Sequence, residues 1–340
     1  MRPRALMAAF TVVALSLAFA LAGCRGQSTS GISPANSPKG PRITVAMVTH
    51  GQAFDPFWGL VQKGAQQAAS DFNVSLKYQS PEVTNPQAQA SMITAAANAK
   101  PDAMVVTIPD AAALSNAIQQ VSSSGIPVVV VNVGDSVYQH VGALTFVGQP
   151  DSTAGEEAGK AMATAGVRRA LCVIHEEQNT ALTDRCAGFS RQLTASGGSV
   201  QILHVNGSQL HQAQVAIEQA LKRNPGINGV LATGIIGFQA AGGALHALNA
   251  FGRIKLGTFD VSTADLTAVQ NGQALFVIDQ QPFLEGYDAV QVAAFDVRYG
   301  QHPFRPIYTG PSLVTKSNAA KVAQLYKNTG IPLFQGGYPQ

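Results

Sequence analysis

Short runs of β-branched residues alternate with longer segments of helical periodicity from residue 43 onward. Strands are predicted at runs such as RITVAMVT (42–49), DAMVVTIP (102–109), IPVVVVNVG (126–134), RALCVIHE (169–176) and IKLGTFD (254–260). Between such runs, segments such as FWGLVQKGAQQAASDF (57–72) repeat apolar residues at helical spacing. IPVVVV is apolar throughout, which is typical of a strand buried on both faces. Regular alternation of strands and helices favours parallel sheets that are covered by helices.

The number of strand-like runs predicts two domains rather than one. About ten such runs are present, whereas a single sheet usually holds about four to six strands. A length of 340 residues also suggests roughly two domains of ordinary size. A natural break lies at VGQPDSTAG (147–155), where a strand ends in glycine and proline before a new helix. The predicted fold class is therefore α/β, with two doubly wound parallel-sheet lobes.

The first 24 residues, MRPRALMAAFTVVALSLAFALAGC, differ from the rest of the chain. Two arginines precede a long uncharged apolar stretch, small residues and a cysteine, which is the layout of a secretory signal. The alternative is a membrane-spanning anchor, because the apolar run nearly reaches the necessary length. We favour a signal peptide over residues 1–23, because the run stops at LAGC, which resembles a bacterial lipobox with Cys24 as the lipidated N-terminus. Residues 24–41, rich in Ser, Gly and Pro, are then expected to form a flexible tether.

Composition argues against several classes of protein. Hydrophobic residues make up 46% of the chain and charged residues 12%, so extensive disorder is not expected. The formal net charge is +3, and two of the positive charges, Arg2 and Arg4, belong to the predicted signal. The near-neutral remainder and the lack of a basic stripe argue against nucleic acid as a partner.

Two cysteines remain beyond Cys24, and they are Cys172 and Cys186. An exported protein meets oxidising conditions, which favours a disulfide between them. They fall at the end of a strand-like run and early in the helix that follows. Closing a loop of this length contributes roughly 3 kcal/mol where the geometry permits. Two buried free thiols are the alternative.

Polar and aromatic residues follow the carboxyl ends of several predicted strands, which is where open α/β sheets bind ligands. They are Asp55, Phe57 and Trp58 after the first strand, Asn132 and Asp135 after IPVVVV, Asp260 after IKLGTF, and Asp279, Gln280 and Gln281 after ALFVI. The stretch HGQAFDPFW (50–58) also holds the single Trp of the chain. The expected mouth of the site is therefore lined by carboxylates, amides and aromatic rings.

The sequence shows no complete enzymatic signature. A phosphate-binding loop of the form G-x-x-x-x-G-K-[ST] is absent, and TGIIGFQAAGG (233–243) lacks the spacing of a dinucleotide loop, so its glycines indicate close helix–sheet packing. CVIHEE places His175 near Cys172 and Glu176, but the seven histidines show no metal-binding spacing. No serine sits in a G-x-S-x-G elbow. We therefore expect neither a metal nor a cofactor nor catalytic residues.

Sugar binding suits these residues better. Each hydroxyl of a sugar can donate and accept, and the forked groups of Asp, Asn, Gln and Arg engage two neighbouring hydroxyls at once. The apolar faces of a pyranose or polyol pack on aromatic rings. DPFW (55–58) offers both kinds of contact at one strand end. A purely structural role is the alternative, with Asp55 as the N-cap of a helix that begins at Pro56, and with Phe57 and Trp58 in the core.

Five segments in order resemble the type I periplasmic binding proteins, specifically the ribose-binding-like sugar receptors of ABC importers. They are DPFW, GIPVVVVNVG, LTDRCAGF, GTFD and VIDQQPFLEGY, and the likeness extends from about residue 43 to 328. The fold of that family has two similar lobes joined by three crossovers. The resemblance implies a first lobe over residues 42–148 with 281–309, a second over 149–280 with 310–330, and a tail at 331–340. Both lobes would close over a ligand by a hinge motion.

The resemblance also implies roles for particular residues. Asp55 would bind hydroxyls, while Phe57 and Trp58 would line the face of the ring. The remaining candidates are Asn132 at its strand end, Arg185 as a charged donor, Asp260 as an acceptor, Gln280 at a hinge strand and, in second place, Asn179. Ribose binders typically carry an arginine, an asparagine and an aromatic residue where this chain has Val133, Gly234 and Ser208. These departures argue against ribose itself and leave a sugar or polyol as the expected ligand.

The expected protein is thus a monomeric, extracytoplasmic lipoprotein that is anchored to the cell membrane through Cys24. It would hand a sugar or polyol to the permease subunits of an ABC importer. A sensor that binds an autoinducer-like polyol and docks on a receptor is the alternative, because it could use the same body. An α/β enzyme is disfavoured because catalytic residues are lacking. A repressor of the lactose-repressor type is disfavoured because the predicted signal peptide occupies the place of its DNA-binding head.

Overall fold

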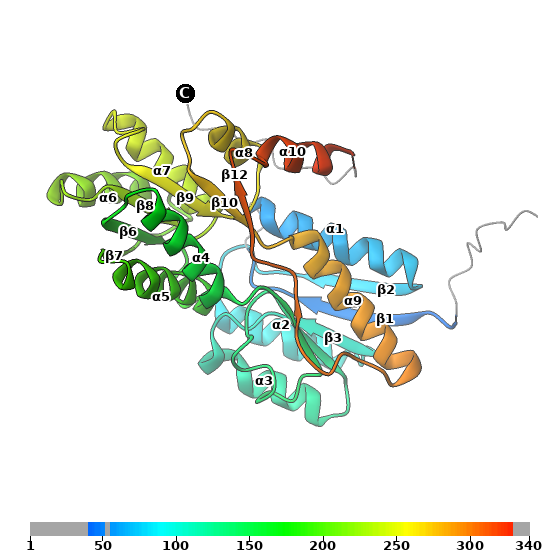
Figure 1. Ribbon diagram of the computed structural model, residues 1–340. Coiled ribbons are helices and arrows are strands. Elements are labelled where there is room, and N and C mark those ends of the chain that lie inside the picture. The colour runs from blue at the N-terminus through cyan, green and yellow to red at the C-terminus, as the bar shows by residue number, and fades with distance from the viewer. Residues whose placement is uncertain (1–39, 52–54, 329–340) are drawn as a thin grey trace, which may run out of the picture. The chain divides into compact units, whose positions relative to one another are not determined.

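The structure is a computed structural model, and it describes residues 40–51 and 55–328 (Figure 1). The predicted signal peptide, Cys24, nearly all of the predicted tether and the tail at 331–340 lie outside these residues. Among the helices that are described, none combines the length and the apolar character that a membrane crossing requires.

The first lobe is built on a sheet of parallel strands. In the part of the chain that the structure describes, the strand order is β11-β5-β4-β3-β1-β2. The strands are β1 (Ile43–Val48), β2 (Val74–Gln79), β3 (Ala103–Val106), β4 (Val128–Val131), β5 (Thr145–Gly148) and β11 (Ile307–Tyr308). Helices α1 (Pro56–Asp71) and α9 (Pro282–Tyr299) lie side by side over one face (Figure 1), and α2 (Pro86–Asn98) and α3 (Ala111–Ser123) cover the other.

Successive residues of strand β4 are buried on opposite faces of this sheet. Val129 and Val131 pack with α1 and α9, whereas Val128 and Val130 pack with α2 and α3. Because helices cover both faces, neither face has a place for polar side chains. The uninterrupted run of valines therefore reflects burial on both faces of the sheet, as the sequence pattern predicted.

The second lobe repeats this design with one difference. Its strand order, within the described residues, is β12-β10-β9-β8-β6-β7. The strands are β6 (Arg169–Ile174), β7 (Ser199–His204), β8 (Gly229–Ala232), β9 (Lys255–Phe259), β10 (Phe276–Asp279) and β12 (Ser312–Thr315). Helices α4 (Asp151–Thr164) and α5 (Thr180–Ala195) cover one face, and α6 (Leu210–Arg223), α7 (Ile235–Ala247), α8 (Thr263–Gln270) and α10 (Ala319–Asn328) cover the other.

The difference is that β12 runs antiparallel to β10, while the other strand pairs of this sheet are parallel. Ser312 at the start of β12 pairs with Asp279 at the end of β10. The chain thus enters the second lobe at the carboxyl ends of its strands, so β12 has to run against them.

Within residues 55–328, the chain passes between the two sheets three times. Residues 149–150 connect β5 to α4, residues 280–281 connect β10 to α9, and residues 309–311 connect β11 to β12. The fold class predicted from the sequence is confirmed, since the protein has two α/β lobes whose parallel sheets are joined by three crossovers.

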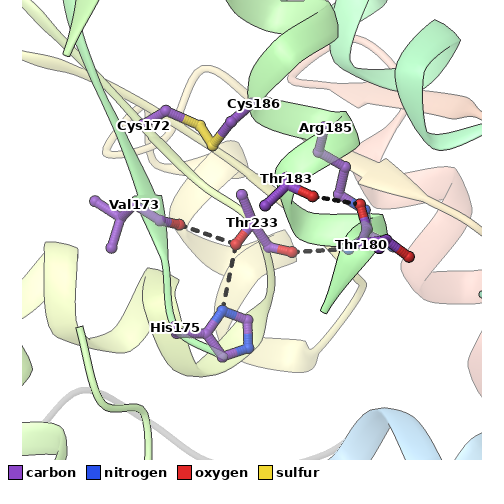
Figure 2. The surroundings of a disulfide bond; sticks show 8 residues. All are labelled: Cys172, Val173, His175, Thr180, Thr183, Arg185, Cys186 and Thr233. Atoms are coloured by element: carbon purple, nitrogen blue, oxygen red, sulfur yellow. Dashed lines mark hydrogen bonds between the residues drawn. A yellow bond between two sulfur atoms is a disulfide. The ribbon is translucent and has the colours of Figure 1, made fainter. Parts of the chain in front are cut away.

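A disulfide joins Cys172 of β6 to Cys186 of α5 in the core of the second lobe (Figure 2). The two Cα atoms are 5.9 Å apart, which lies within the usual range for such bonds. Both cysteines are fully buried. The bond ties helix α5, which carries Arg185, to a strand of its own sheet.

Helices α4 and α5 pack at very short distance because glycine lies at the contact. A Cβ atom at Gly155 would lie 2.1 Å from the carbonyl oxygen of Arg185, and one at Gly188 would lie 2.0 Å from that of Ser152. Any side chain at these positions would push the helices apart. The close approach brings Asp151, the first residue of α4, within hydrogen-bond distance of Arg185.

Candidate ligand-binding site

Residues that follow the strands of both lobes surround one small cavity. All eight residues singled out by the resemblance line it: Asp55, Phe57, Trp58, Asn132, Asn179, Arg185, Asp260 and Gln280. Six residues that were not proposed as ligand-binding complete the lining: His50, His175, Glu176, Ala181, Leu182 and Thr233. The volume of the cavity is about 30 Å³, which is room for about two water molecules. A sugar therefore enters only if the lining residues move apart.

Three other residues noted at strand ends, Asp135, Asp279 and Gln281, do not line this cavity. Asp279 instead accepts a hydrogen bond of 2.9 Å from the hydroxyl of Tyr326, and its other oxygen accepts one of 2.8 Å from the backbone N–H of Gln281. A residue that follows a strand thus lies at the edge of the sheet that borders the cavity, but it lines the cavity only if its side chain points that way.

Asp55 caps helix α1 and also lines the cavity. It precedes Pro56, the first residue of α1, and its Oδ1 accepts a hydrogen bond of 3.0 Å from the backbone N–H of Phe57. The same side chain lines the cavity. Burial, reinforced by the charges of Asp260 and Glu176, raises the pKa of Asp55 to about 8. The helix cap uses one carboxyl oxygen, so the other is left for a ligand hydroxyl, to which it donates a hydrogen bond while protonated and from which it accepts one when ionised.

Phe57 and Trp58 likewise belong both to the core and to the lining of the cavity. They are 4% and 7% exposed, and they pack with the apolar residues between α1 and the first sheet. Their rings meet edge to face with centroids 5.1 Å apart, and the ring of Trp58 meets that of His50 in the same way at 4.7 Å. Core packing therefore fixes the aromatic surface that borders the cavity.

Arg185 is held by three hydrogen bonds from its three guanidinium nitrogens. Nε donates to Asp151 Oδ1 at 2.7 Å, Nη1 to the carbonyl of Thr233 at 2.7 Å, and Nη2 to Gln280 Oε1 at 3.1 Å. The guanidinium also lies over the ring of Phe259, 4.7 Å from its centroid. These contacts occupy three of the five guanidinium donors and set the plane of the group.

Thr233 connects Arg185 to a histidine of the same lobe, as Figure 2 shows. Its carbonyl accepts from Arg185, and its hydroxyl donates to the carbonyl of Val173 at 2.9 Å and lies 3.4 Å from His175 Nδ1. Thr233 directly follows β8 (Gly229–Ala232). Its position at a strand end is the signal by which the sequence could have revealed it.

Gln280 is the centre of a polar network that includes both lobes. Its Nε2 donates to Asp260 Oδ1, and its Oε1 accepts from Arg185 and, at 3.4 Å, from Asn132 Nδ2. Asn132 Nδ2 also donates to Glu285 Oε2 at 3.0 Å. Because Gln280 lies on the second passage between the sheets, its hydrogen bonds join the lining of the cavity to the connection between the lobes.

Two of the lining residues adopt a left-handed backbone directly after their strands. Asn132 follows β4 with a φ of 65°, and Asp260 follows β9 with a φ of 70°. Asn and Asp tolerate this region better than most residues, and such conformations gather at functional sites. Burial raises the pKa of Asp260 to about 6.

His50 is not among the residues predicted from the sequence to bind a ligand, and His175 and Glu176 were weighed only as metal ligands. His50 and His175 follow shortly after β1 and β6, so the rule that found the other residues applies to them as well. Burial lowers the pKa of each histidine to about 3. Both imidazoles are therefore neutral near pH 7, and each offers one donor and one acceptor.

Side chains of the two lobes meet beside the cavity. His50 Nε2 lies 3.2 Å from Asn179 Nδ2, which donates to Glu176 Oε2 at 2.7 Å. Thr84 of the first lobe donates to Glu176 Oε1 at 3.4 Å. Separation of the lobes would break the contacts of His50 and Thr84 with the second lobe.

Within the described residues, Asp55, His175 and Glu176 form a group whose geometry would admit a cation, since one ligand atom from each lies within 4.8 Å of the others. Asp55 is far from the other two along the chain, so no motif spacing could indicate the group. Carboxylates and imidazoles are also ordinary partners of hydroxyl groups. The chemistry of the group therefore fits a polyol as well as a metal ion.

Two α/β lobes with a polar cavity at their strand ends define a ligand-binding protein of the two-lobed class. The chain belongs to the periplasmic binding protein family, since the family model described as "Periplasmic binding protein domain" matches residues 45–298. This is a family of binding proteins and not of enzymes.

Three relatives illustrate the family. A carbohydrate transporter from Acidothermus cellulolyticus 11B, solved in complex with myo-inositol, is 37% identical, and the match covers 85% of this chain and 99% of that chain with a TM-score of 0.80. A periplasmic sugar-binding protein of an ABC sugar transporter from Legionella pneumophila is 25% identical, with 79% and 100% covered and a TM-score of 0.74. The xylose/arabinose-binding protein of Sulfolobus acidocaldarius is 24% identical over 285 residues, which are 77% of this chain and 70% of that protein.

Proposed function

We propose that this protein captures a sugar or sugar alcohol between its lobes and delivers it to an ABC importer. The observation that carries the proposal is the lining of the cavity, where carboxylates, amides, imidazoles and one guanidinium surround an aromatic surface. Such groups match neighbouring hydroxyls on a ring whose faces are apolar. The 37% identical relative that was solved with myo-inositol supports a cyclic polyol, and myo-inositol is our first candidate.

The charges around the cavity favour a neutral ligand. Asp55, Asp260 and Glu176 contribute carboxyl groups, whereas the guanidinium of Arg185 is already paired with Asp151. An anionic sugar would place its charge beside Asp260, whose pKa of about 6 leaves it ionised near pH 7, and like charges at such a site are unfavourable. A neutral polyol can instead donate a hydroxyl to this carboxylate.

Capture requires the lobes to part and to close again. The three passages between the sheets are short, and we propose that they act together as the hinge. After closure, water would be excluded from the cavity, and the hydrogen bonds to the ligand would be stronger than in a solvated site.

A thermal-shift screen over pentoses, hexoses, polyols and inositols tests the proposal, with isothermal titration of each hit. We expect myo-inositol or another neutral member to raise the melting temperature, and glucuronate and myo-inositol 1-phosphate to leave it unchanged. Uptake of the identified ligand in cells that lack the protein then tests delivery to an importer. The proposal is wrong if no neutral sugar or polyol binds.

We further propose that residues 1–23 are a signal peptide and that a lipid on Cys24 anchors the mature protein on the extracytoplasmic face of the membrane. The sequence LAGC before the tether supports this proposal. Cys24→Ser is expected to release the protein from the membrane fraction or to leave the precursor uncleaved. A variant that fractionates and migrates like the parent would exclude the lipid anchor.

A further inference from the structure

We infer that a second pocket beside the cavity is a subsite for a neutral glycosyl group attached to the captured ring. We call it the outer pocket. It lies among residues 83–86 of the first lobe and residues 175–178 and 205–208 of the second, and its volume is about 460 Å³. A volume of about 300–1,000 Å³ is usual for ligand sites. The inference rests on the proposed function, because the outer pocket would bind the second ring of a ligand whose first ring occupies the cavity.

The cavity and the outer pocket share a wall. His175 and Glu176 line both spaces. The carboxylate of Glu176 accepts from Thr84 of the first lobe at 3.4 Å and from Asn179 of the second at 2.7 Å. Because the Thr84 bond joins the lobes, parting of the lobes opens this wall. A ring in the cavity can therefore extend a substituent past Glu176 into the outer pocket.

The floor of the outer pocket in the second lobe is held by hydrogen bonds within the loop at residues 205–208 and to His175. The backbone N–H of Gly207 donates to the carbonyl of His175 at 2.9 Å. A Cβ atom at Gly207 would lie 2.8 Å from that oxygen, so the close approach requires glycine. Asn206 Oδ1 accepts from the backbone N–H of Ser208 at 2.9 Å. The loop is thereby held against His175, and less conformational freedom is lost when a ligand binds.

The lining indicates which substituent fits. Hydroxyl and amide groups come from Thr84, Gln178, Asn206 and Ser208, and apolar surface comes from Val83 and Pro86. Glu176 and Glu177 add carboxyl groups, and no Lys or Arg is among the described residues that line the pocket. A phosphate or carboxylate substituent would face these acids without a counter-charge. A glycosyl ring instead offers hydroxyls to the polar groups and C–H faces to the apolar ones.

Isothermal titration with matched ligand pairs tests the inference. The pairs are myo-inositol with its 1-O-galactoside, D-xylose with xylobiose, and D-glucose with cellobiose. We expect the parent to bind one two-ring ligand at least tenfold more tightly than the corresponding single ring. Ser208→Trp fills the outer pocket and should remove most of this advantage. Ser199→Trp places the same ring at the exposed start of β7, and it should leave the advantage intact.

The inference is overturned if a single ring binds the parent and no two-ring partner binds more tightly. It is also overturned if Ser208→Trp and Ser199→Trp give the same ratio of the two affinities. In both cases the proposed function stands, because the single ring is still captured. If neither single-ring nor two-ring ligands bind, the proposed function and the inference fail together.

Discussion

Asp55 caps helix α1 through the N–H of Phe57, and its side chain also lines the cavity. Asn is as good an N-cap as Asp, so Asp55→Asn should preserve the contribution of the cap to the free energy of unfolding. The substitution replaces a carboxyl oxygen at the cavity, which can accept a hydrogen bond, by an amide nitrogen that only donates. We expect the affinity for the ligand identified in the screen to fall by roughly 1–3 kcal/mol, measured by isothermal titration.

Asp110→Asn is the matched control for this change. Asp110 caps α3 by accepting a hydrogen bond of 3.1 Å from the N–H of Ala113, and it does not line the cavity. Its substitution should alter neither stability nor affinity. If Asp55→Asn binds the ligand as tightly as Asp110→Asn, then Asp55 serves only as a helix cap.

The raised pKa of Asp55 also makes stability depend on pH. Its ordinary pKa is 3.8 and its pKa in the fold is about 8. Between these values the folded protein holds a proton that the unfolded chain has lost, so the contribution of Asp55 to the free energy of unfolding is full below pH 4 and declines as pH rises through about 8. As the pH rises from about 4 to about 8, the free energy of unfolding of Asp55→Asn should therefore increase relative to that of the parent by up to about 1.4 kcal/mol per pH unit.

Urea denaturation of the parent and of Asp55→Asn at pH 5 and pH 8 measures this effect. His50 and His175 are the same in both proteins, so their titration cancels in the comparison. A difference in the free energy of unfolding that is equal at the two pH values would contradict a raised pKa for Asp55.

At the scale of elements, the contact between α4 and α5 places a buried ion pair, Asp151–Arg185, behind the cavity. Removal of one partner from a buried pair costs roughly 3–5 kcal/mol, because the other charge stays buried alone. We expect Arg185→Ala to lower the free energy of unfolding by this amount, and Arg185→Ala/Asp151→Ala to recover part of it. Urea denaturation measures both values.

The same two helices supply an exposed control pair. Arg191 Nη2 and Glu156 Oε1 are 2.6 Å apart, and both side chains are open to solvent. Arg191→Ala should therefore cost about 1 kcal/mol or less. If Arg185→Ala lowers the free energy of unfolding no more than Arg191→Ala does, then burial does not determine how much the Asp151–Arg185 pair stabilises the fold.

The disulfide is the second link between elements, and it joins residues 14 positions apart. Closure of such a loop in the unfolded chain is worth about 3 kcal/mol. Cys172→Ala/Cys186→Ala should lower the free energy of unfolding by about this amount relative to the oxidised parent. Intact-mass measurement with and without reductant counts the thiols, and two free thiols in protein from an oxidising compartment would show that the bond does not form.

At the scale of the whole molecule, Trp58 can report the closing of the lobes. It is the single tryptophan of the chain, and it borders a cavity to which both lobes contribute. Entry of a ligand exchanges water for sugar beside its ring, so its fluorescence emission should shift in proportion to the occupied fraction. Trp58→Phe is the control and should show no such signal. A ligand that binds by titration but leaves the emission unchanged would place the binding site elsewhere.

The fold class, and the edge of the sheets at which the proposed site lies, can be predicted from the amino-acid sequence alone. Alternating strand and helix patterns are local, and the apolar run at residues 126–131 already indicates a strand with helices on both faces. Residues that directly follow strands, such as Asn132 and Asp260, could be chosen because parallel strands all end at one edge. The same rule also applies to His50 and Thr233, which follow β1 and β8.

Which of these residues contact one another depends on how the helices and strands pack. Asp151 reaches Arg185 because glycines let α4 and α5 approach closely, and Glu176 bonds to Thr84 because two lobes are brought together. The antiparallel course of β12 follows from the end of the sheet at which the chain re-enters. The spacing of apolar residues in a sequence indicates which face of each helix or strand is buried. Distances between residues far apart in the chain depend on how those elements pack, and no local pattern contains that information.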